Sequence, residues 1–474
     1  MEAAARLGQR PLTLRGFLEA LVARYPEQVV RVDRPVDPAN FDVTAFLVNL
    51  ERAGRFPLVH FANPRDLFGE PSRFPLVTNV YADRVRCALA LGLPPEAAKL
   101  PVSLEYARRE ARRLPPVVVP PREAPVKTVV RRGEEADLRI FPIVRHHEMD
   151  PAPYIDMAVA MRDPDSGAYN LAFLRNMYKG PRRLGLHMSP RHNWQIVRKY
   201  EERGEPCPAA IVVSHHPAFF LGVLNVSPFG ADDYAVVGSI MDEPLRLVPS
   251  ETWGEAFLVP ADADIVIEGV VPPGVREIEG PFGEFPGTYG PQRLRWVIEV
   301  TAITHRADAV YQDIFVGHRD VHILGAIPKE GSLFNRIKGV VPTVTGVHLP
   351  TSGCGRFHCY IALDKKVEGE PKQAALVAMG ECDFVKNVIV VDADIDPFNE
   401  EEVLWAWATR VQADEDLDVI KNVKGSALDP SLADDIRTAK VIIDATRPLD
   451  RPFASRIRVP EEALARMALD RAER

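Results

Sequence analysis

Residues 276–290 read Arg-Glu-Ile-Glu-Gly-Pro-Phe-Gly-Glu-Phe-Pro-Gly-Thr-Tyr-Gly, and this stretch decides the fold of the middle of the chain. Its prolines and glycines exclude a helix, because proline lacks a backbone donor and glycine favours turns. Glu277 and Glu279 lie two positions apart, so on an extended backbone their side chains share a face. We predict a shaped loop that presents carboxylates. The alternative is a solvated acidic turn between two strands.

The aromatic residues of the same stretch favour the first interpretation. Phe282, Phe285 and Tyr289 give the loop apolar surface with which it can pack inward. A carboxyl group that packs against aromatic surface loses hydration, and its pKa rises. This is how proteins make a general acid that works at neutral pH. The stretch is therefore a candidate for catalysis.

Length and composition set the class of protein. The chain has 474 residues, of which 46% are hydrophobic and 26% charged, and its net charge is -8. The length indicates two or three domains. There is no basic block, which argues against binding to nucleic acid or to an anionic membrane. No apolar run of about 18 residues and no signal-peptide core are present, so we expect a cytoplasmic protein.

Residues 1–120 are predicted to form a small α/β domain. Helical spacing of apolar residues extends over 12–25, and a second helix is expected between the later strands. The proline-rich connector at 115–121 should be extended and marks a boundary. The predicted strands cover 29–32, 58–61 and 75–78.

Residues 121–330 change toward β structure, and we predict a split β-barrel that is interrupted by a helix. Strands at 155–162 and 169–177 flank a turn and should form a hairpin. Ser189, followed by Pro190, is typical of a helix N-cap, and the helix should end at Gly204. Further strands are predicted at 209–214, 265–271 and 296–304.

Residues 331–474 return to a βαβ-like pattern, so the overall fold class is α/β (α+β). The tail from Pro460 to Arg474 is predicted to be a charged amphipathic helix that exchanges or docks. The other predicted strands are 357–363, 387–391 and 440–444, and the other helices are 373–379 and 400–411.

Three groups of polar residues could bind ligands. The turn that contains Arg191 and His192 precedes a helix, and helix N-termini bind phosphate. Asp233 and its neighbour Asp232 could bind a hard divalent ion, although on its own this pair is better explained as a helix N-cap. Asn170 and Arg175 lie five positions apart on one predicted strand. They can therefore reach a common site only if a bulge intervenes.

Five ordered blocks resemble the UbiD family of prenylated-flavin-dependent decarboxylases, and the resemblance covers essentially the whole chain. It implies an N-terminal α/β domain, a flavin-binding split barrel and a C-terminal α/β domain. The blocks are Asn170-Leu-Ala-Phe-Leu-Arg175, Ser189-Pro-Arg-His192, Ala231-Asp-Asp-Tyr-Ala235, Val259-Pro-Ala-Asp-Ala-Asp-Ile-Val-Ile-Glu-Gly269 and Glu279-Gly-Pro-Phe-Gly-Glu284.

The resemblance implies a set of cofactor ligands. Asn170, His192 and Asp233 match residues that bind Mn²⁺ or Mg²⁺ at the phosphate of prenylated FMN, with K⁺ or Na⁺ nearby. The family commonly has glutamate at 233, so the shorter aspartate either shifts the ion or shares its role with Asp232. Arg191 and Lys440 are implied as further contacts to the cofactor.

The resemblance also implies the catalytic residues. Arg175, Glu279 and Glu284 match the family's Arg-Glu-Glu trio, and Glu277 is left without a catalytic role. Decarboxylation leaves an electron pair that no side chain can accept, so a modified flavin is the expected electron sink. We expect Arg175 to hold the substrate carboxylate and Glu284 to return a proton to carbon.

The predicted function is reversible, non-oxidative decarboxylation of an α,β-unsaturated, aromatic or heteroaromatic acid. Two alternatives are a non-catalytic flavin- or phosphate-binding protein for maturation or assembly, and a metal-dependent hydrolase. A flavin prenyltransferase is the implied supplier of the cofactor, and the resemblance implies a homodimer or higher homo-oligomer. Candidate residues of the substrate pocket are Phe285, His318, Arg319 and His322.

Overall fold

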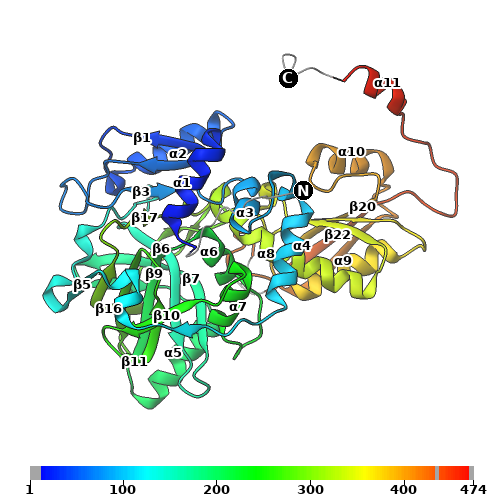
Figure 1. The fold of residues 1–474 in the computed structure, drawn as a ribbon. Helices are drawn as coiled ribbons and strands as arrows, with labels where there is room; N and C mark the ends of the chain where they lie inside the picture. Colours follow the sequence, from blue (N-terminus) through cyan, green and yellow to red (C-terminus); the bar gives the residue numbers. More distant parts are fainter. Residues whose placement is uncertain (1–11, 433–436, 469–474) are drawn as a thin grey trace.

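The computed structural model describes residues 12–432 and 437–468. It has an N-terminal α/β part, a central β-barrel and a C-terminal α/β part, in that order along the chain (Figure 1). The predicted class, α/β (α+β), is confirmed. The domain limits at 120 and 330 stay predictions.

The N-terminal sheet has the order β1-β2-β3-β17 and is completed by a strand from beyond the barrel. Pairs β1–β2 and β3–β17 are parallel, and β2–β3 is antiparallel. The pairing of β17 with β3 therefore joins the N-terminal part of the chain to the barrel. The strands are β1 (Val29–Val32), β2 (Leu58–Phe61), β3 (Leu76–Thr78) and β17 (Tyr311–Gln312), and the helices are α1 (Leu14–Arg24), α2 (Asp42–Arg52), α3 (Arg84–Ala90) and α4 (Leu100–Glu110).

The proline-rich connector is extended, as predicted, and it is also hydrogen-bonded. Its strand β4 (Val117–Val118) pairs in parallel with β10 (Arg246–Ser250). Strand β11 (Gly254–Pro260) completes this three-stranded sheet. The connector therefore belongs to the folded body and is not a free linker.

Six antiparallel strands form the central barrel, which confirms the predicted barrel architecture. The order is β12-β9-β6-β7-β8-β16, and β16 pairs with β12 to close the ring. Strands β5 (Val129–Arg132) and β13 (Glu277–Glu279) add to β16 outside the ring. The six strands are β6 (Tyr154–Arg162), β7 (Tyr169–Gly180), β8 (Arg183–Leu186), β9 (Cys207–Ser214), β12 (Ile265–Val271) and β16 (Arg293–His305).

One glycine permits the closure of the barrel. The register of β12 against β16 shifts between Glu268 and Gly269. A Cβ atom at Gly269 would lie 2.5 Å from the carbonyl oxygen of Glu299. The two backbones therefore approach too closely for any side chain at this position.

The helix predicted to begin at Ser189 begins later. Helix α5 covers His192–Arg203, its N-cap is Arg191, and no side chain caps it. The Arg191 amide donates to the Ser189 carbonyl oxygen over 2.7 Å, so these residues form a tight turn and Ser189 is not the cap. The predicted end at Gly204 is confirmed, since Gly204 has a φ of 69°. Helices α6 (Pro217–Val223) and α7 (Asp233–Met241) follow.

The C-terminal sheet has the order β18-β19-β20-β22-β21. Its three central strands are parallel, which confirms the predicted βαβ pattern, and both edge strands are antiparallel. The strands are β18 (Val344–His348), β19 (His358–Leu363), β20 (Asn387–Asp392), β21 (Leu417–Lys424) and β22 (Arg437–Ala445), and the helices are α8 (Arg319–Val340), α9 (Glu370–Glu381) and α10 (Glu400–Arg410).

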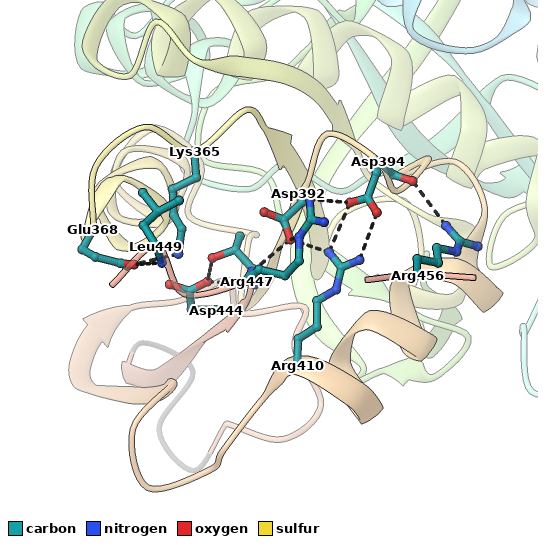
Figure 2. A network of polar contacts seen from close by, with 10 residues as sticks. Lys365, Glu368, Asp392, Asp394, Arg410, Asp444, Arg447, Leu449 and Arg456 are labelled. Carbon is teal, nitrogen blue, oxygen red and sulfur yellow. Dashed lines mark hydrogen bonds and ion pairs between the residues drawn. The ribbon is translucent and has the colours of Figure 1, made fainter. Parts of the chain in front are cut away.

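Charged residues at one end of this sheet anchor the C-terminal arm, which we define as residues 447–468. Asp392 and Asp394 both pair with Arg410 and with Arg447 (Figure 2). Arg456 donates to the carbonyl oxygen of Asp394 over 3.3 Å. The arm ends in α11 (Glu461–Arg466), which lies away from the folded body (Figure 1). The predicted tail helix is present there, and its residues 469–474 lie outside the described part of the chain.

Among the residues that the structure describes, none forms a helix with both the length and the apolar character to span a membrane.

Candidate active site

Arg175 joins the two glutamates of the predicted trio. It projects from β7 and donates from Nε and Nη2 to the two carboxylate oxygens of Glu279, over 2.9 and 2.8 Å. Its Nη1 donates to Glu284, which follows the short strand β14 (Phe282–Gly283). Glu279 is fully buried and Arg175 is 7% exposed. The bidentate pair is therefore shielded from water, and such pairs fix geometry closely.

The two glutamates differ in their environment. Burial raises the pKa of Glu284 most, the charge of Arg175 lowers it, and the net pKa lies above its ordinary value. The carboxylates of Glu279 and Asp156 add to this increase. Glu284 therefore keeps its proton to a higher pH than an ordinary glutamate does, which suits a general acid. Glu277 pairs instead with Lys179 and Arg183 at the barrel rim, as expected for a residue outside the trio.

Two residues that were not identified from the sequence support Glu279. The hydroxyl group of Tyr154 donates to Glu279 over 3.3 Å. The ring of His187 lies 3.8 Å from the same carboxylate. Burial, with the charge of Arg175, lowers the pKa of His187 to about 2, so its imidazole is neutral. Neither residue belongs to a recognisable motif, and only the folded barrel brings them to the trio.

Asn170 and His192 lie in contact, and Asp233 binds the backbone of the residue that follows Asn170. Asn170 Oδ1 lies 3.1 Å from His192 Nδ1. Asp233, the first residue of α7, accepts the Leu171 amide over 2.7 Å and the Asn225 side-chain amide over 3.1 Å. Asp232 has another role, because its side chain accepts the amides of Tyr234 and Ala235 and so caps α7. Asp233 is therefore better placed than Asp232 to act as a ligand.

The chemistry of Asn170, His192 and Asp233 fits a hard divalent cation. Asp233 is 5% exposed, and burial raises its pKa to about 7. No basic side chain pairs with it within the described ranges, so the ionised form lacks a partner that a cation would supply. An amide oxygen, an imidazole nitrogen and a carboxylate oxygen suit Mn²⁺ or Mg²⁺. The residues present thus fit the metal that the sequence implies.

No bulge separates Asn170 from Arg175 on β7. The register of β7 against β6 is unbroken from Tyr169 to Met177. Unbroken alternation directs the side chains of Asn170 and Arg175 to opposite faces of β7. The condition for a common site is therefore not met, and each residue contributes to a different group of side chains along one strand.

Lys440 and Arg191 converge on the segment 382–384. Lys440 is 1% exposed and donates to the carbonyl oxygens of Met379, Cys382 and Asp383 over 3.2–3.4 Å. Burial lowers its pKa. Arg191 pairs with the Asp383 carboxylate over 3.3 Å. The structure therefore brings these two predicted contacts, from the barrel and the C-terminal sheet, to one segment.

The four predicted pocket residues divide into two groups. Phe285 packs against Phe357 and Phe384, and its carbonyl oxygen lies 2.8 Å from His322 Nε2. In contrast, Arg319 donates to the Ala82 carbonyl oxygen in the N-terminal part. His318 pairs with Glu51 and lines a cavity of about 400 Å³ beside α2. Only Phe285 and His322 therefore meet.

Two cations near Phe285 were not identified from the sequence. Arg356 is 8% exposed and lies 4.6 Å over the Phe285 ring. Lys329, on α8, donates to the Gly325 carbonyl oxygen. Burial lowers the pKa of Arg356 to about 10 and, with the charge of Arg356, that of Lys329 to about 8. Neither pairs with a carboxylate in the portion of the chain that is described.

Comparison with known families covers nearly the whole described chain. Three family models match, all of 3-octaprenyl-4-hydroxybenzoate carboxy-lyase. They are the N-terminal domain at residues 23–99, the Rift-related domain at 117–319 and the C-terminal domain at 322–445.

Individual relatives agree with the family models. The chain is 38% identical to an anhydromevalonate phosphate decarboxylase of Methanothermobacter thermautotrophicus over 67% of this chain and 75% of the relative. It is 31% identical to a phenolic acid decarboxylase of Sedimentibacter hydroxybenzoicus over 92% of both chains. The UbiD-class enzyme HmfF of Pelotomaculum thermopropionicum, solved in complex with FMN, gives a TM-score of 0.88 at 38% identity over 96% of this chain and 98% of its own. An evolved dimeric form of HmfF with prFMN gives 0.85 at 36% identity over 97% and 99%.

Proposed function

This chain belongs to the UbiD family of carboxy-lyases, and from this premise we propose that it catalyses reversible, non-oxidative decarboxylation of an α,β-unsaturated, aromatic or heteroaromatic acid with prenylated FMN. The supporting observation is the buried Arg175, which binds Glu279 and Glu284 together while burial keeps Glu284 a proton donor.

Each residue of the trio has a distinct task. Prenylated FMN, when bound, supplies the sink for the electron pair that decarboxylation leaves. Arg175 orients the substrate carboxylate by hydrogen bonds, and Glu279 fixes the guanidinium. As the bond to CO2 breaks, the substrate carbon gains a proton from Glu284, which then regains one from water. Phe285 and its aromatic neighbours exclude bulk water from the site.

Residues of the barrel and of the C-terminal sheet would hold the cofactor together. We propose that Asn170, His192 and Asp233 bind Mn²⁺ or Mg²⁺, with K⁺ or Na⁺ nearby. Arg191 and Lys440 would bind the cofactor phosphate. The chemistry of the donor set supports this proposal, and so does the buried Asp233, which pairs with no basic side chain among the described residues.

The surroundings of Phe285 support a substrate with a second polar group. Arg356 is buried and Lys329 is half-buried, and neither has a carboxylate partner among the described residues. Such cations favour an anionic ligand. We propose that the substrate ring or alkene packs near Phe285 with a polar substituent toward these cations. Matched acids with and without an anionic substituent test this, and lower KM for the former is expected.

Assembly and cofactor supply complete the proposal. The C-terminal arm exposes apolar residues along its length, including Ile457, which is 96% exposed, and this supports a homodimer or higher homo-oligomer. A flavin prenyltransferase is the proposed supplier of the cofactor. The cytoplasmic location stays a prediction.

The two alternatives are less well supported. A binding protein for maturation or assembly has no need of a proton donor such as Glu284. A hydrolase requires an open metal position and an activated water. It would also leave the buried trio of Arg175, Glu279 and Glu284 without a role.

An experiment on the cofactor distinguishes all three. The protein is produced with and without a flavin prenyltransferase, and its absorption spectrum and native mass are measured. Our proposal predicts a bound species heavier than FMN by one prenyl unit, present only on co-production and lost in Asp233→Ala. A colourless protein of apo mass in both preparations, with divalent metal still bound, would favour the alternatives.

A further inference from the structure

The glutamate proposed to donate the proton lies at the end of a very small hairpin. Strand β14 pairs with β15 (Tyr289–Gly290) through only Phe282–Gly290 and Gly283–Tyr289. Glu284 follows at once, and its amide donates to the Thr288 carbonyl oxygen over 2.9 Å. An isolated hairpin of this size is not stable in water. Other parts of the chain must therefore fix the position of Glu284.

Residues 145–150 make the contacts that hold both strands. Oδ1 of Asp150 accepts the Gly283 amide over 3.1 Å, and the Tyr289 hydroxyl accepts the Met149 amide over 3.2 Å. The His147 ring packs so closely on Gly283 that a Cβ atom there would overlap it. The hairpin is thus pressed against this segment.

The opposite side of the hairpin touches the catalytic groups. A Cβ atom at Gly290 would lie 3.0 Å from Oε1 of Glu284 and 3.5 Å from Nη1 of Arg175. The hairpin therefore occupies the space between the segment 145–150 and the catalytic pair. Any displacement on one side must move the other.

The surroundings of Asp150 suit it to holding the hairpin in place. It is fully buried, and its Oδ2 accepts the His147 amide over 2.9 Å. Burial raises its pKa, but the hydrogen bond from His147 and the charge of His146 outweigh burial, so the pKa lies below its ordinary value. These contacts favour the ionised form of Asp150, in which both of its oxygens accept hydrogen bonds.

We propose that Asp150 is a positioning residue for the reaction: by joining the Gly283 amide to the segment 145–150, its carboxylate sets the place of Glu284 beside Arg175. This rests on the proposed function of Glu284. Asp150 touches neither substrate nor cofactor and acts only through the hairpin.

The first test needs no substrate and no cofactor. Hydrogen–deuterium exchange is measured by mass spectrometry on full-length wild type, Asp150→Asn and the matched control Asp264→Asn. Asp264 is equally buried, and its carboxylate accepts the Val310 amide over 2.9 Å and lies 4.0 Å from Arg306, both outside the trio and the hairpin. In Asp150→Asn, exchange at residues 282–290 should rise about tenfold, because the Gly283 amide loses a charged acceptor. In Asp264→Asn, faster exchange should be confined to the neighbourhood of Val310.

The second test uses holoenzyme and the acid that wild type turns over fastest in a panel of unsaturated and aromatic acids. For Asp150→Asn, kcat should fall about tenfold with KM within about twofold, since ground-state binding is kept. The alkaline limb of the kcat profile should also move to lower pH, because a displaced Glu284 loses its burial. Asp264→Asn should leave kcat, KM and the pH profile unchanged.

Unchanged exchange at 282–290 in Asp150→Asn would overturn the proposal. So would faster exchange there with wild-type kcat and pH profile, since Asp150 would then only stabilise the fold. If no acid is turned over by wild type, the function proposed for the chain fails, and with it the catalytic role of Asp150; the exchange result alone reports whether the hairpin is held as described.

Discussion

At the scale of the residue, the burial of Glu284 and the charges around it decide whether its pKa lies above or below its ordinary value. Burial and the carboxylates of Glu279 and Asp156 raise its pKa, and Arg175 lowers it less. The acid is active while it is protonated, so activity is present below its pKa and is lost as pH rises through that value. We predict that kcat falls on the alkaline side, with a midpoint above that of an ordinary glutamate. A profile of kcat against pH tests this, and a midpoint at or below about 4.3 would contradict it.

Asp233 gives a second prediction at this scale. Burial raises its pKa to about 7, which shows that the ionised form is costly when no cation is bound. Asp233→Asn should therefore leave the metal-free protein at least as stable as wild type. Added Mn²⁺ should raise the Tm of wild type and not that of the variant. Thermal unfolding in EDTA and in Mn²⁺ measures both effects. An equal rise in Tm for the two proteins would exclude Asp233 as a ligand.

The catalytic residues could be predicted only in part from the sequence. Spacing alone placed Glu277 and Glu279 on one face and could not separate them; only the family resemblance chose Glu279. The structure gives the physical difference, because Glu279 is fully buried against Arg175 while Glu277 meets surface cations. His187, Tyr154 and Arg356 escaped notice since contacts across the fold, not local patterns, give them their roles.

At the scale of the element, most strands of the barrel were predictable because they are apolar runs bounded by turns, and β6, β9 and β12 are buried almost throughout. Helix α8 was not, since Gly325, Pro328 and Gly331 interrupt the helical signal. The structure explains two of them. A Cβ atom at Gly325 would overlap Arg356, and one at Gly331 would overlap the Ser103 carbonyl oxygen of α4. Close packing of α8 against its neighbours thus requires glycines, and these residues weaken the helical pattern in the sequence.

Closure of the barrel gives a prediction for one strand pair. Gly269→Ala places a Cβ atom 2.5 Å from the Glu299 carbonyl oxygen. Because both backbones are fixed by pairing, we expect the free energy of unfolding to fall by about 1–3 kcal/mol. Gly180→Ala is the matched control, since no atom lies within 4 Å of its Cβ position. Urea unfolding compares the two, and equal stability would show that the β12–β16 contact relaxes freely.

At the scale of the whole molecule, the C-terminal arm leaves the body with its apolar side chains uncovered. Ile457 is 96% and Met467 80% exposed. We predict that these residues pack on a second copy, so that Ile457→Glu shifts the protein toward monomer. Val22→Glu, at another exposed apolar position, should not. Light scattering after size exclusion measures the mass, and a wild type that is already monomeric would refute the prediction.

The central claim is that the chain decarboxylates an unsaturated or aromatic acid with Glu284 as the proton donor. The most direct measurement is release of CO2 from a panel of such acids, by wild type and Glu284→Gln, each co-produced with a flavin prenyltransferase. We predict turnover by wild type, and loss by a factor of about 10² or more in the variant, with the cofactor still bound. Equal rates for the two proteins, or no CO2 from any acid by a wild type that carries the cofactor, would contradict the account.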